Sequence, residues 1–387
     1  MLVNGNAAPP SFSGAATDPR FEAVRKLLKL PADPSQRETV EAALKLVLTT
    51  AVGARRADEF IAESRPVEIA FEIFPGCKVE TGWGRRFLDC SSGHTNAEGT
   101  ALRVALAETF LRTDLAFRRQ FLAGVLAHEL FGHSLRTIQA ERAGVGRAYY
   151  HFDGNEADAE ATGLSVDAEL SDLRLSRDAD RYRLFVSSPA AYRDGLQLNM
   201  PYYALTFSRE ELREPVAVLR RRLELCRAQR VANSKLLQRW RKRERHVAHL
   251  LAAHRGETLA GVVVGTAALA EIQGSIARGV QGAERRRGML DDIELAVIQH
   301  IDYDSLPAGQ KRIAEMNASL DTDAGKAFLA AHERDLKSQR EFLASKLGHK
   351  PAFQVSGHAN PGQVTWAQLQ KMLQAEKELG PDTMTRK

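Results

Sequence analysis

The chain has 387 residues, of which 44% are hydrophobic and 27% charged, and its formal net charge is +5. This composition is that of a soluble protein with a sizeable buried core and room for two or three domains. Its three cysteines, Cys77, Cys90 and Cys226, have no paired spacing. They indicate neither a disulfide framework nor a thiolate zinc site and fit a reducing compartment, so we expect a cytoplasmic protein.

The N-terminal part begins with residues 1–18, which are rich in Ala, Gly, Ser and Pro and contain no continuous apolar segment of the signal-peptide type. We expect a disordered lead here. Residues 19–60 are predicted to form a helical segment. Within it, Ser35-x-x-Glu38 has the form of a capping box that opens a helix ending near Gly53. One face of this helix carries Val40, Ala43, Leu44, Val47 and Leu48.

Strand-like runs follow at residues 67–74, 78–81, 86–89 and 102–106, separated by Pro-Gly and Ser-Gly pairs. They predict a small sheet. The next apolar residues recur at helical spacing and predict a buried helix, for which Thr113 or Asp114 is placed as the N-cap. These apolar residues are Phe117, Phe121, Leu122, Val125, Leu126 and Leu130.

The buried helix contains the hexapeptide from His128 to His133, HELFGH, and Glu156 follows 23 residues after the second histidine. Two imidazoles, the carboxylate of Glu129 and a later carboxylate are what a hydrolytic zinc centre requires. The common motif H-E-x-x-H has a step of four between its histidines, whereas the step here is five. In a regular α-helix that step turns the second imidazole roughly 140° from the first. We therefore expect a π-bulge, which Gly132 most easily permits, to restore a shared face.

A second predicted helix carries Glu156 and Glu160 on one face, a turn apart. If Glu156 binds a metal, Glu160 can accept the free ring N–H of a ligating histidine and fix its tautomer. The alternative is a pair of core histidines and a solvated acidic helix, with Asp153 as N-cap and Glu156 as its capping-box partner. The two motifs together favour a metal site.

The two motifs resemble segments of known protein families. HELFGH resembles the HEXXXH motif of the dipeptidyl peptidase III family, whose HEXXGH form includes the glycine, and NEADAEATGL resembles that family's EECRAEAVGL segment. In that family the two motifs are much farther apart, and Asn155 stands where a glutamate is expected. AHELFGHSLRTIQ is similar to the HEIGxHxLRxxN stretch of the HEXXXH tubulin-tyrosine carboxypeptidases (MATCAP family) and their bacterial relatives, whose motif spacing fits better.

This second resemblance covers roughly residues 65 to 170, although Ala157-Asp158-Ala159 replaces the Gly-Leu-Ala of that family's QEGLA motif. It implies an α+β protein whose zincin-like catalytic domain, a small sheet plus active-site helices, spans residues 61–207 and is joined to extensive additional helices. It implies a zinc-dependent metallopeptidase, with carboxypeptidase-like exopeptidase action favoured. The substrate would be a peptide or protein, and an acidic tail is one candidate.

The roles that the resemblance implies fall on five residues. His128, His133 and Glu156 would bind Zn²⁺, Glu129 would act as general base on a water activated by the ion, and Glu160 would support a ligating histidine. An oxyanion donor is sought among Tyr149, Tyr150, His151, Tyr202 and Tyr203, because they lie near the ligand segment or soon after it. A cation for a substrate carboxylate is sought in Arg136 or Arg147.

The remaining region, residues 208–387, is predicted to be mainly helical and includes a basic helix. Eleven Lys or Arg residues lie between Arg220 and Arg245, against two glutamates. This stripe would suit nucleic acid or an acidic polypeptide. A solvated basic face of an amphipathic helix is the plainer interpretation, so nucleic acid is not the expected partner. The apolar stretch Leu259 to Ala270 is too short to span a bilayer, and we expect no membrane association.

Two alternatives to a zinc peptidase of this kind remain open. One is a TldD-like protease, which also uses an H-E-x-x-x-H helix but whose usual downstream cysteine ligand has no counterpart here. The other is a non-enzymatic binding protein that uses its basic helical half to contact nucleic acid or an acidic partner. The sequence does not indicate an oligomeric state.

Overall fold

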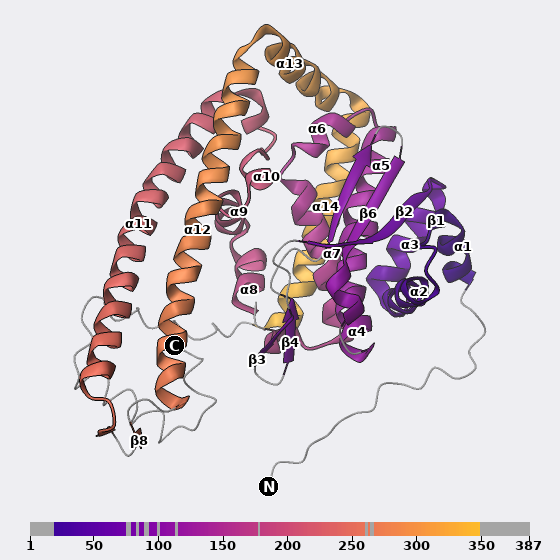
Figure 1. The fold of residues 1–387 in the computed structure, drawn as a ribbon. Helices are drawn as coiled ribbons and strands as arrows, with labels where there is room; N and C mark the ends of the chain where they lie inside the picture. Colours follow the sequence, from indigo (N-terminus) through magenta and orange to yellow (C-terminus); the bar gives the residue numbers. More distant parts are fainter. Residues whose placement is uncertain are drawn as a thin grey trace. The chain divides into compact units, whose positions relative to one another are not determined.

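The computed structural model describes residues 19–74, 79–82, 85–88, 93–98, 101–112, 115–176, 179–259, 262–263 and 267–348. The chain divides into two compact units (Figure 1). The first comprises residues up to Tyr149, Gly154–Ser176 and Thr322–Lys346, and the second comprises Tyr150–Asp153, Arg177–Asp321 and the residues from Leu347 onward. The predicted disordered lead, residues 1–18, and the end of the predicted helical region, residues 349–387, lie outside the described residues.

The first unit contains a four-stranded sheet in the order β1-β2-β6-β5. Its strands are β1 (Leu28–Lys29), β2 (Val67–Glu72), β5 (Gly93–Glu98) and β6 (Ala101–Ala107). The first three in this order run parallel, whereas β5 pairs antiparallel with β6 and forms one edge. A separate hairpin joins β3 (Val79–Gly82) to β4 (Arg85–Leu88).

The predicted strand runs therefore correspond to β2, β3, β4 and β6, and the prediction of a small sheet before the histidine-bearing helix is confirmed. Strand β5 was not predicted, because its sequence GHTNAE lacks a β-branched or aromatic run. Pairing with β6, from Gly93↔Leu106 to Glu98↔Ala101, holds it in place.

Helices pack around this sheet in the first unit, and the α+β class is confirmed. Its N-terminal helices are α1 (Pro19–Leu27), α2 (Pro34–Leu48) and α3 (Ala51–Glu63). The helices after the sheet are α4 (Leu115–Leu126), a π-helix (Ala127–Ser134), α5 (Leu135–Arg142), α6 (Gly146–Tyr150), α7 (Gly154–Leu170) and α14 (Asp323–Leu347). One core joins the sheet to α1–α5, the π-helix and α7, with Val104 of β6, Leu44 of α2 and Leu126 of α4 all buried. Each such side chain contributes about 1.5–3 kcal/mol.

The N-terminal helical segment differs in detail from its prediction. The cap of α2 is Asp33, which accepts a hydrogen bond from the Gln36 N–H at 2.9 Å, because Pro34 already occupies the first helical position. The expected capping box at Ser35 was wrong. The single helix predicted to run to Gly53 also breaks at Thr50, whose hydroxyl caps α3 by accepting from the Gly53 N–H at 3.0 Å.

The second unit is helical apart from the small hairpin of β7 (Thr258–Leu259) and β8 (Val262–Val263). Its helices are α8 (Ala179–Ser187), α9 (Pro189–Gln197), α10 (Pro201–Ala204), α11 (Pro215–Ala253), α12 (Ala267–Ser305) and α13 (Pro307–Asp321). Helices α11 and α12 run side by side as a long hairpin (Figure 1). Between them, Trp240 packs where a Cβ at Gly279 would come within 2.9 Å of its ring. Among the described residues no helix has the length and apolar character needed to cross a bilayer.

Candidate metal centre

The histidines lie on a stretch of π-helix, as the five-residue step predicts. The π-helix spans Ala127–Ser134, and the backbone N–H of Leu135 donates to the carbonyl of Leu130, five residues earlier. The wider turn brings both imidazoles to one side, with ring centroids 4.8 Å apart and ring planes at 80°. Within the π-helix, the Ser134 hydroxyl donates to the Glu129 carbonyl at 3.1 Å.

Gly132 is needed here for packing. A Cβ at this position would lie 2.5 Å from the Cα of Ala159 on α7, far inside van der Waals contact. At a second close approach, a Cβ on Gly163 would lie 3.0 Å from the Gly124 carbonyl and 3.1 Å from the Cβ of His128. Gly132 is not among the described glycines with positive φ. From the sequence, Gly132 was explained by its backbone freedom, but the structure gives a steric reason. The glycines let α7 approach the histidine-bearing helix.

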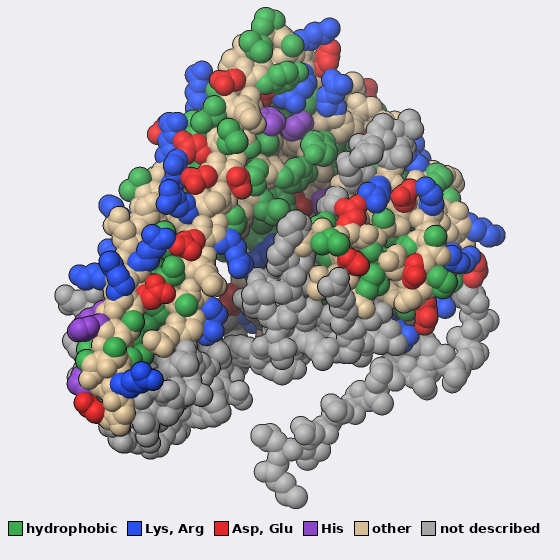
Figure 2. Space-filling model, in the orientation of Figure 1, with side chains coloured by type: hydrophobic (Ala, Val, Ile, Leu, Met, Phe, Trp, Pro, Cys, Tyr) green, Lys and Arg blue, Asp and Glu red, His purple; other side chains and the backbone are tan. Residues whose placement is uncertain are grey.

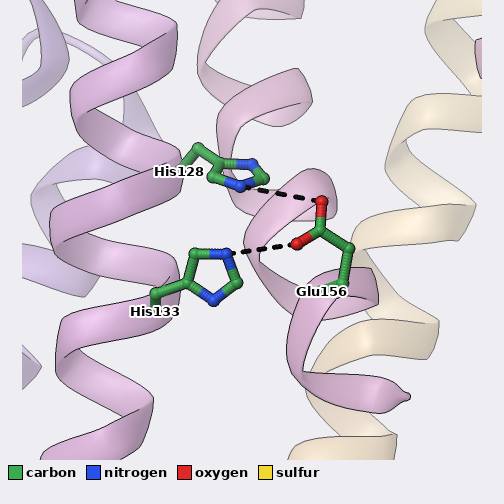
Figure 3. A group of neighbouring side chains, drawn as sticks. All are labelled: His128, His133 and Glu156. Atoms are coloured by element: carbon green, nitrogen blue, oxygen red, sulfur yellow. Dashed lines mark ion pairs between the residues drawn. The ribbon is translucent and has the colours of Figure 1, made fainter. Parts of the chain in front are cut away.

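This approach places Glu156 opposite both histidines (Figure 3). One carboxylate oxygen lies 3.8 Å from Nε2 of His128, and the other lies 3.2 Å from Nε2 of His133. The three potential ligand atoms lie within 4.8 Å of one another. Glu156 is buried, and the histidine side chains are 18% and 14% exposed. The structure thus brings together the three residues predicted as ligands.

The opposite ring nitrogens of the histidines face two further residues of α7. Nδ1 of His133 donates to Oδ1 of Asn155 at 2.9 Å, so in the neutral ring it is Nε2, on the side of Glu156, that has the free lone pair. Nδ1 of His128 lies 3.7 Å from Oε2 of Glu160, close but longer than a hydrogen bond. Glu160 therefore lies where the sequence predicted, whereas Asn155 was identified only as a departure from a family pattern. Its position one residue before a predicted ligand was the available signal.

Negative charge dominates the electrostatics of this group. Burial disfavours the imidazolium of His133, but the hydrogen bond and charge of Glu156, together with the charge of Glu129 and the contact with Asn155, more than offset it. They raise the pKa of His133 to about 9. The site therefore favours a positive charge beside Glu156, either a proton on His133 or a bound cation. A metal would have to displace that proton, because a histidine ligand must be neutral.

Glu129 is buried on the helix between the two histidines and is held by the edge strand β5. The Thr95 hydroxyl lies 2.8 Å from Oε2 of Glu129 and 3.1 Å from its backbone carbonyl. A Cβ at Gly93 would lie 3.1 Å from Oε1, so the glycine leaves that oxygen room. Neither Gly93 nor Thr95 was predicted as part of the site, because the strand that carries them was not recognised.

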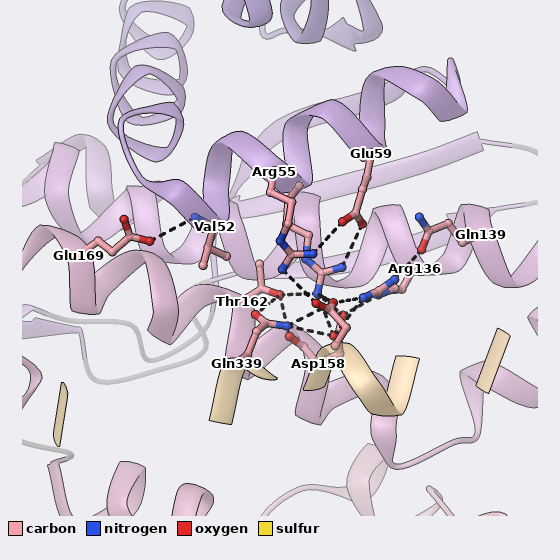
Figure 4. A network of polar contacts seen from close by, with 11 residues as sticks. Val52, Arg55, Glu59, Arg136, Gln139, Asp158, Thr162, Glu169 and Gln339 are labelled. Carbon is pink, nitrogen blue, oxygen red and sulfur yellow. Dashed lines mark hydrogen bonds and ion pairs between the residues drawn. The ribbon is translucent and has the colours of Figure 1, made fainter. Parts of the chain in front are cut away.

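Behind the ligand-bearing face, α7 is fixed by buried ion pairs (Figure 4). Asp158, fully buried, accepts from Arg56 of α3 at 2.9 Å and from Arg136 of α5 at 2.9 Å. Burial opposes the charge of Asp158, but these two guanidinium groups hold its pKa far below the usual range. Asp335 of α14 pairs with both arginines, and Gln339 of α14 donates to Asp158 at 3.4 Å. Three helices thus fix the position of the helix that carries Glu156.

The other predicted site residues have different outcomes. Arg136 is engaged in the ion pairs just described, so its predicted role as a cation for a substrate carboxylate is wrong. Tyr149 is buried and packs edge-on against Phe328 and His332, which makes it a core residue of the first unit. The remaining oxyanion candidates, Tyr150, His151, Tyr202 and Tyr203, belong to the second unit, and their role stays a prediction.

Comparison of the chain with protein-family models, curated proteins and solved structures found no match. The family resemblance therefore rests on the two motifs, and what it implies for zinc binding and catalysis is carried forward as a proposal.

Proposed function

We propose that the protein is a zinc-dependent metallopeptidase whose first unit contains a zincin-like catalytic site. The observation that carries the proposal is the convergence of three ligand atoms of His128, His133 and Glu156 within 4.8 Å, with the carboxylate of Glu129 on the same turn of helix. The order of sheet, H-E helix and glutamate-bearing helix also agrees with a zincin-like domain.

The donor set fits zinc. Bonds of about 2.1 Å to a tetrahedral zinc ion place neighbouring ligand atoms roughly 3.4 Å apart. One oxygen of Glu156 lies 3.2 Å from Nε2 of His133 and the other lies 3.8 Å from Nε2 of His128, and both distances are near that value. Two imidazoles and one carboxylate are also the protein ligands of many catalytic zinc sites, which keep a fourth position for water or substrate. Zinc held in this way supplies Lewis acidity, which polarises a peptide carbonyl and makes water a stronger acid.

The chain's own residues would divide the proton chemistry between them. Glu129 would take a proton from the attacking water on Oε1, because Oε2 faces the Thr95 hydroxyl, and would return it to the leaving amine. Asn155 would keep His133 in the tautomer that presents Nε2. The arginine pairs of Asp158 would keep α7, and with it Glu156, in register with the π-helix.

The edge strand supports a peptide as the substrate. Strand β5 is the last strand of its sheet, and two of its residues, Gly93 and Thr95, lie against Glu129. An extended peptide can add to such an edge through main-chain hydrogen bonds, which would bring a scissile bond near the proposed base. Cleavage at chain ends follows only from the motif resemblance. With Arg136 engaged elsewhere, Arg147 is the remaining predicted cation for a terminal carboxylate, and it is exposed.

The test measures zinc content and peptide cleavage on the full chain. We expect one zinc per chain in the wild type, loss of zinc in His133→Ala and in Glu156→Ala, and retained zinc in Glu129→Gln. Hydrolysis of a defined peptide pool should fall by about 10²–10⁴-fold in Glu129→Gln. Glu341→Gln, the same change at an exposed residue of α14, serves as the control. Mass spectrometry of the products separates terminal from internal cleavage.

Two results would overturn the proposal. Zinc retained in both ligand variants would move the metal elsewhere. Unchanged hydrolysis in Glu129→Gln would exclude Glu129 as the general base and would contradict the proposed peptidase mechanism.

A further inference from the structure

Most of the cations of α11 fall into two groups. Some are neutralised within the second unit: Arg222 pairs with Glu211 at 2.9 Å, Arg227 with Glu294 at 2.9 Å and Arg230 with Asp291 at 2.8 Å. Farther along, Arg241 pairs with Glu284 at 2.5 Å. Arg243 lies over the ring of Trp240, 5.6 Å from its centroid. These arginines stabilise the α11–α12 hairpin and its base.

A second group has no such role. Lys235, Arg239, Lys242 and Arg245 are exposed, and none of them forms an ion pair with another described residue. Steps of four, three and three residues keep all four within about a third of the helix circumference. His246 and His249 are exposed in the same sector. From Lys235 to His249 this basic stripe extends about 21 Å along the helix. Figure 2 shows Lys and Arg side chains gathered along α11.

The basic stripe contains neither an acidic residue nor an apolar anchor. The one glutamate in this stretch, Glu244, is rotated away from the stripe by roughly 100° or more from each of its four cations. The other residue in the sector is Gln238, which is exposed. Protein partners usually require aromatic or aliphatic anchors at the centre of an interface. Single-stranded nucleic acid usually requires exposed aromatic rings for base stacking. Trp240 cannot serve, because it packs against Gly279 in the hairpin.

The basic stripe is a straight row of positive charges that offers hydrogen-bond donors and no apolar side chain. Such a row matches the phosphodiester backbone of a double helix. A duplex presents about one negative charge per 1.7 Å of its axis, and contacts to phosphates need no apolar complement. We infer that the basic stripe of α11, formed by Lys235, Arg239, Lys242 and Arg245, binds the backbone of a nucleic-acid duplex without sequence preference. This activity belongs to the second unit and does not depend on the proposed metal centre.

The test is binding of the full chain to fluorescein-labelled 30-base-pair duplexes by fluorescence anisotropy, with salt varied from 50 to 200 mM. Four phosphate contacts predict a slope near −3.6 in log K against log salt, which is a loss of roughly 10²-fold over this range. The variant Lys235→Gln/Arg239→Gln/Lys242→Gln/Arg245→Gln should lose most of this slope. Exchanging lysine and arginine at the same four positions should preserve it.

The matched control removes four other exposed cations, all in the first unit, in the variant Lys26→Gln/Lys326→Gln/Arg334→Gln/Lys337→Gln. Its net charge falls by the same amount as in the stripe variant, and we expect wild-type binding. Circular dichroism confirms folding of each variant.

Three results would overturn the inference. Equal binding by the stripe variant and the control would show that net charge alone is responsible. Wild-type binding that does not weaken with salt would exclude phosphate contacts. Tighter stripe-dependent binding to polyglutamate than to DNA or RNA duplexes would assign the surface to an acidic polypeptide. Glu129→Gln should bind duplexes like the wild type, so the failure of either proposal is recognisable by itself.

Discussion

Replacing Gly132 by Ala tests whether the close approach of α7 assembles the metal centre. The new Cβ would lie 2.5 Å from the Cα of Ala159, so the two helices would have to separate by about 1 Å to reach ordinary contact. Overpacking of this kind costs about 1–3 kcal/mol in the free energy of unfolding. Glu156 moves with α7, and its oxygen is only 3.2 Å from Nε2 of His133. We therefore expect zinc affinity to fall at least about tenfold, as it does when the support of a ligand is lost.

The control is Gly288→Ala in α12, where a Cβ meets nothing within 4 Å. Alanine is better than glycine inside a helix by roughly 0.5–1 kcal/mol, so this variant should be slightly more stable and should bind zinc normally. Urea unfolding gives the stabilities, and competition with a chromophoric chelator gives the zinc affinities. The reasoning is refuted if Gly132→Ala is as stable as Gly288→Ala and binds zinc as tightly as the wild type.

Three further predictions concern the surroundings of the site. Asn155→Ala should weaken zinc binding by about 10–100-fold in chelator competition, and Glu160→Gln should weaken it less, because Glu160 lies beyond hydrogen-bond distance. Asp158→Ala leaves the fully buried Arg56 without its fully buried partner, with the partly exposed Asp335 remaining, and should destabilise the fold by about 3–5 kcal/mol in urea, whereas an effect under about 1 kcal/mol would contradict the bracing role. Burial lowers the pKa of His332 to about 4, so the unfolded chain takes up the proton first as pH falls below about 6.5. Stability should therefore drop by about 2 kcal/mol from this group between pH 7 and pH 5, and the drop should be smaller by that amount in His332→Gln.

The candidate site was largely predictable because it depends on residue spacings within single helices. The five-residue step between His128 and His133 requires a deformed helix if both rings are to face one ion, and the π-helix over Ala127–Ser134 has that form. Glu156 and Glu160 lie a turn apart on one helix, so their shared face followed from periodicity. The contact of Asn155 with His133 could not be predicted from the sequence, because an asparagine next to a predicted ligand can equally well face solvent.

The fold was predictable where the hydrophobic periodicity is strong. It was missed where pairing with another segment of the chain determines the secondary structure. The apolar runs of β2 and β6 identify them as strands, but GHTNAE becomes strand β5 only because β6 offers it a partner. Arg136 was one of two candidate cations for a substrate carboxylate, because it lies close to the histidine motif in the sequence. Its burial depends on Asp335, which lies 199 residues later in the chain, and no local pattern shows that pairing.

These long-range contacts explain why the last helix of the first unit matters to a site formed more than 150 residues earlier. Asp335 and Gln339 of α14 reach the same two groups, Arg136 and Asp158, that fix α7 from behind. The π-helix supplies the histidines and the proposed general base, but a histidine pair alone lacks the third proposed ligand. Only the position of α7 adds Glu156, and that position depends on a small residue at Gly132 in front and on buried ion pairs at the back. Loss of either should therefore reduce metal binding without altering any ligand.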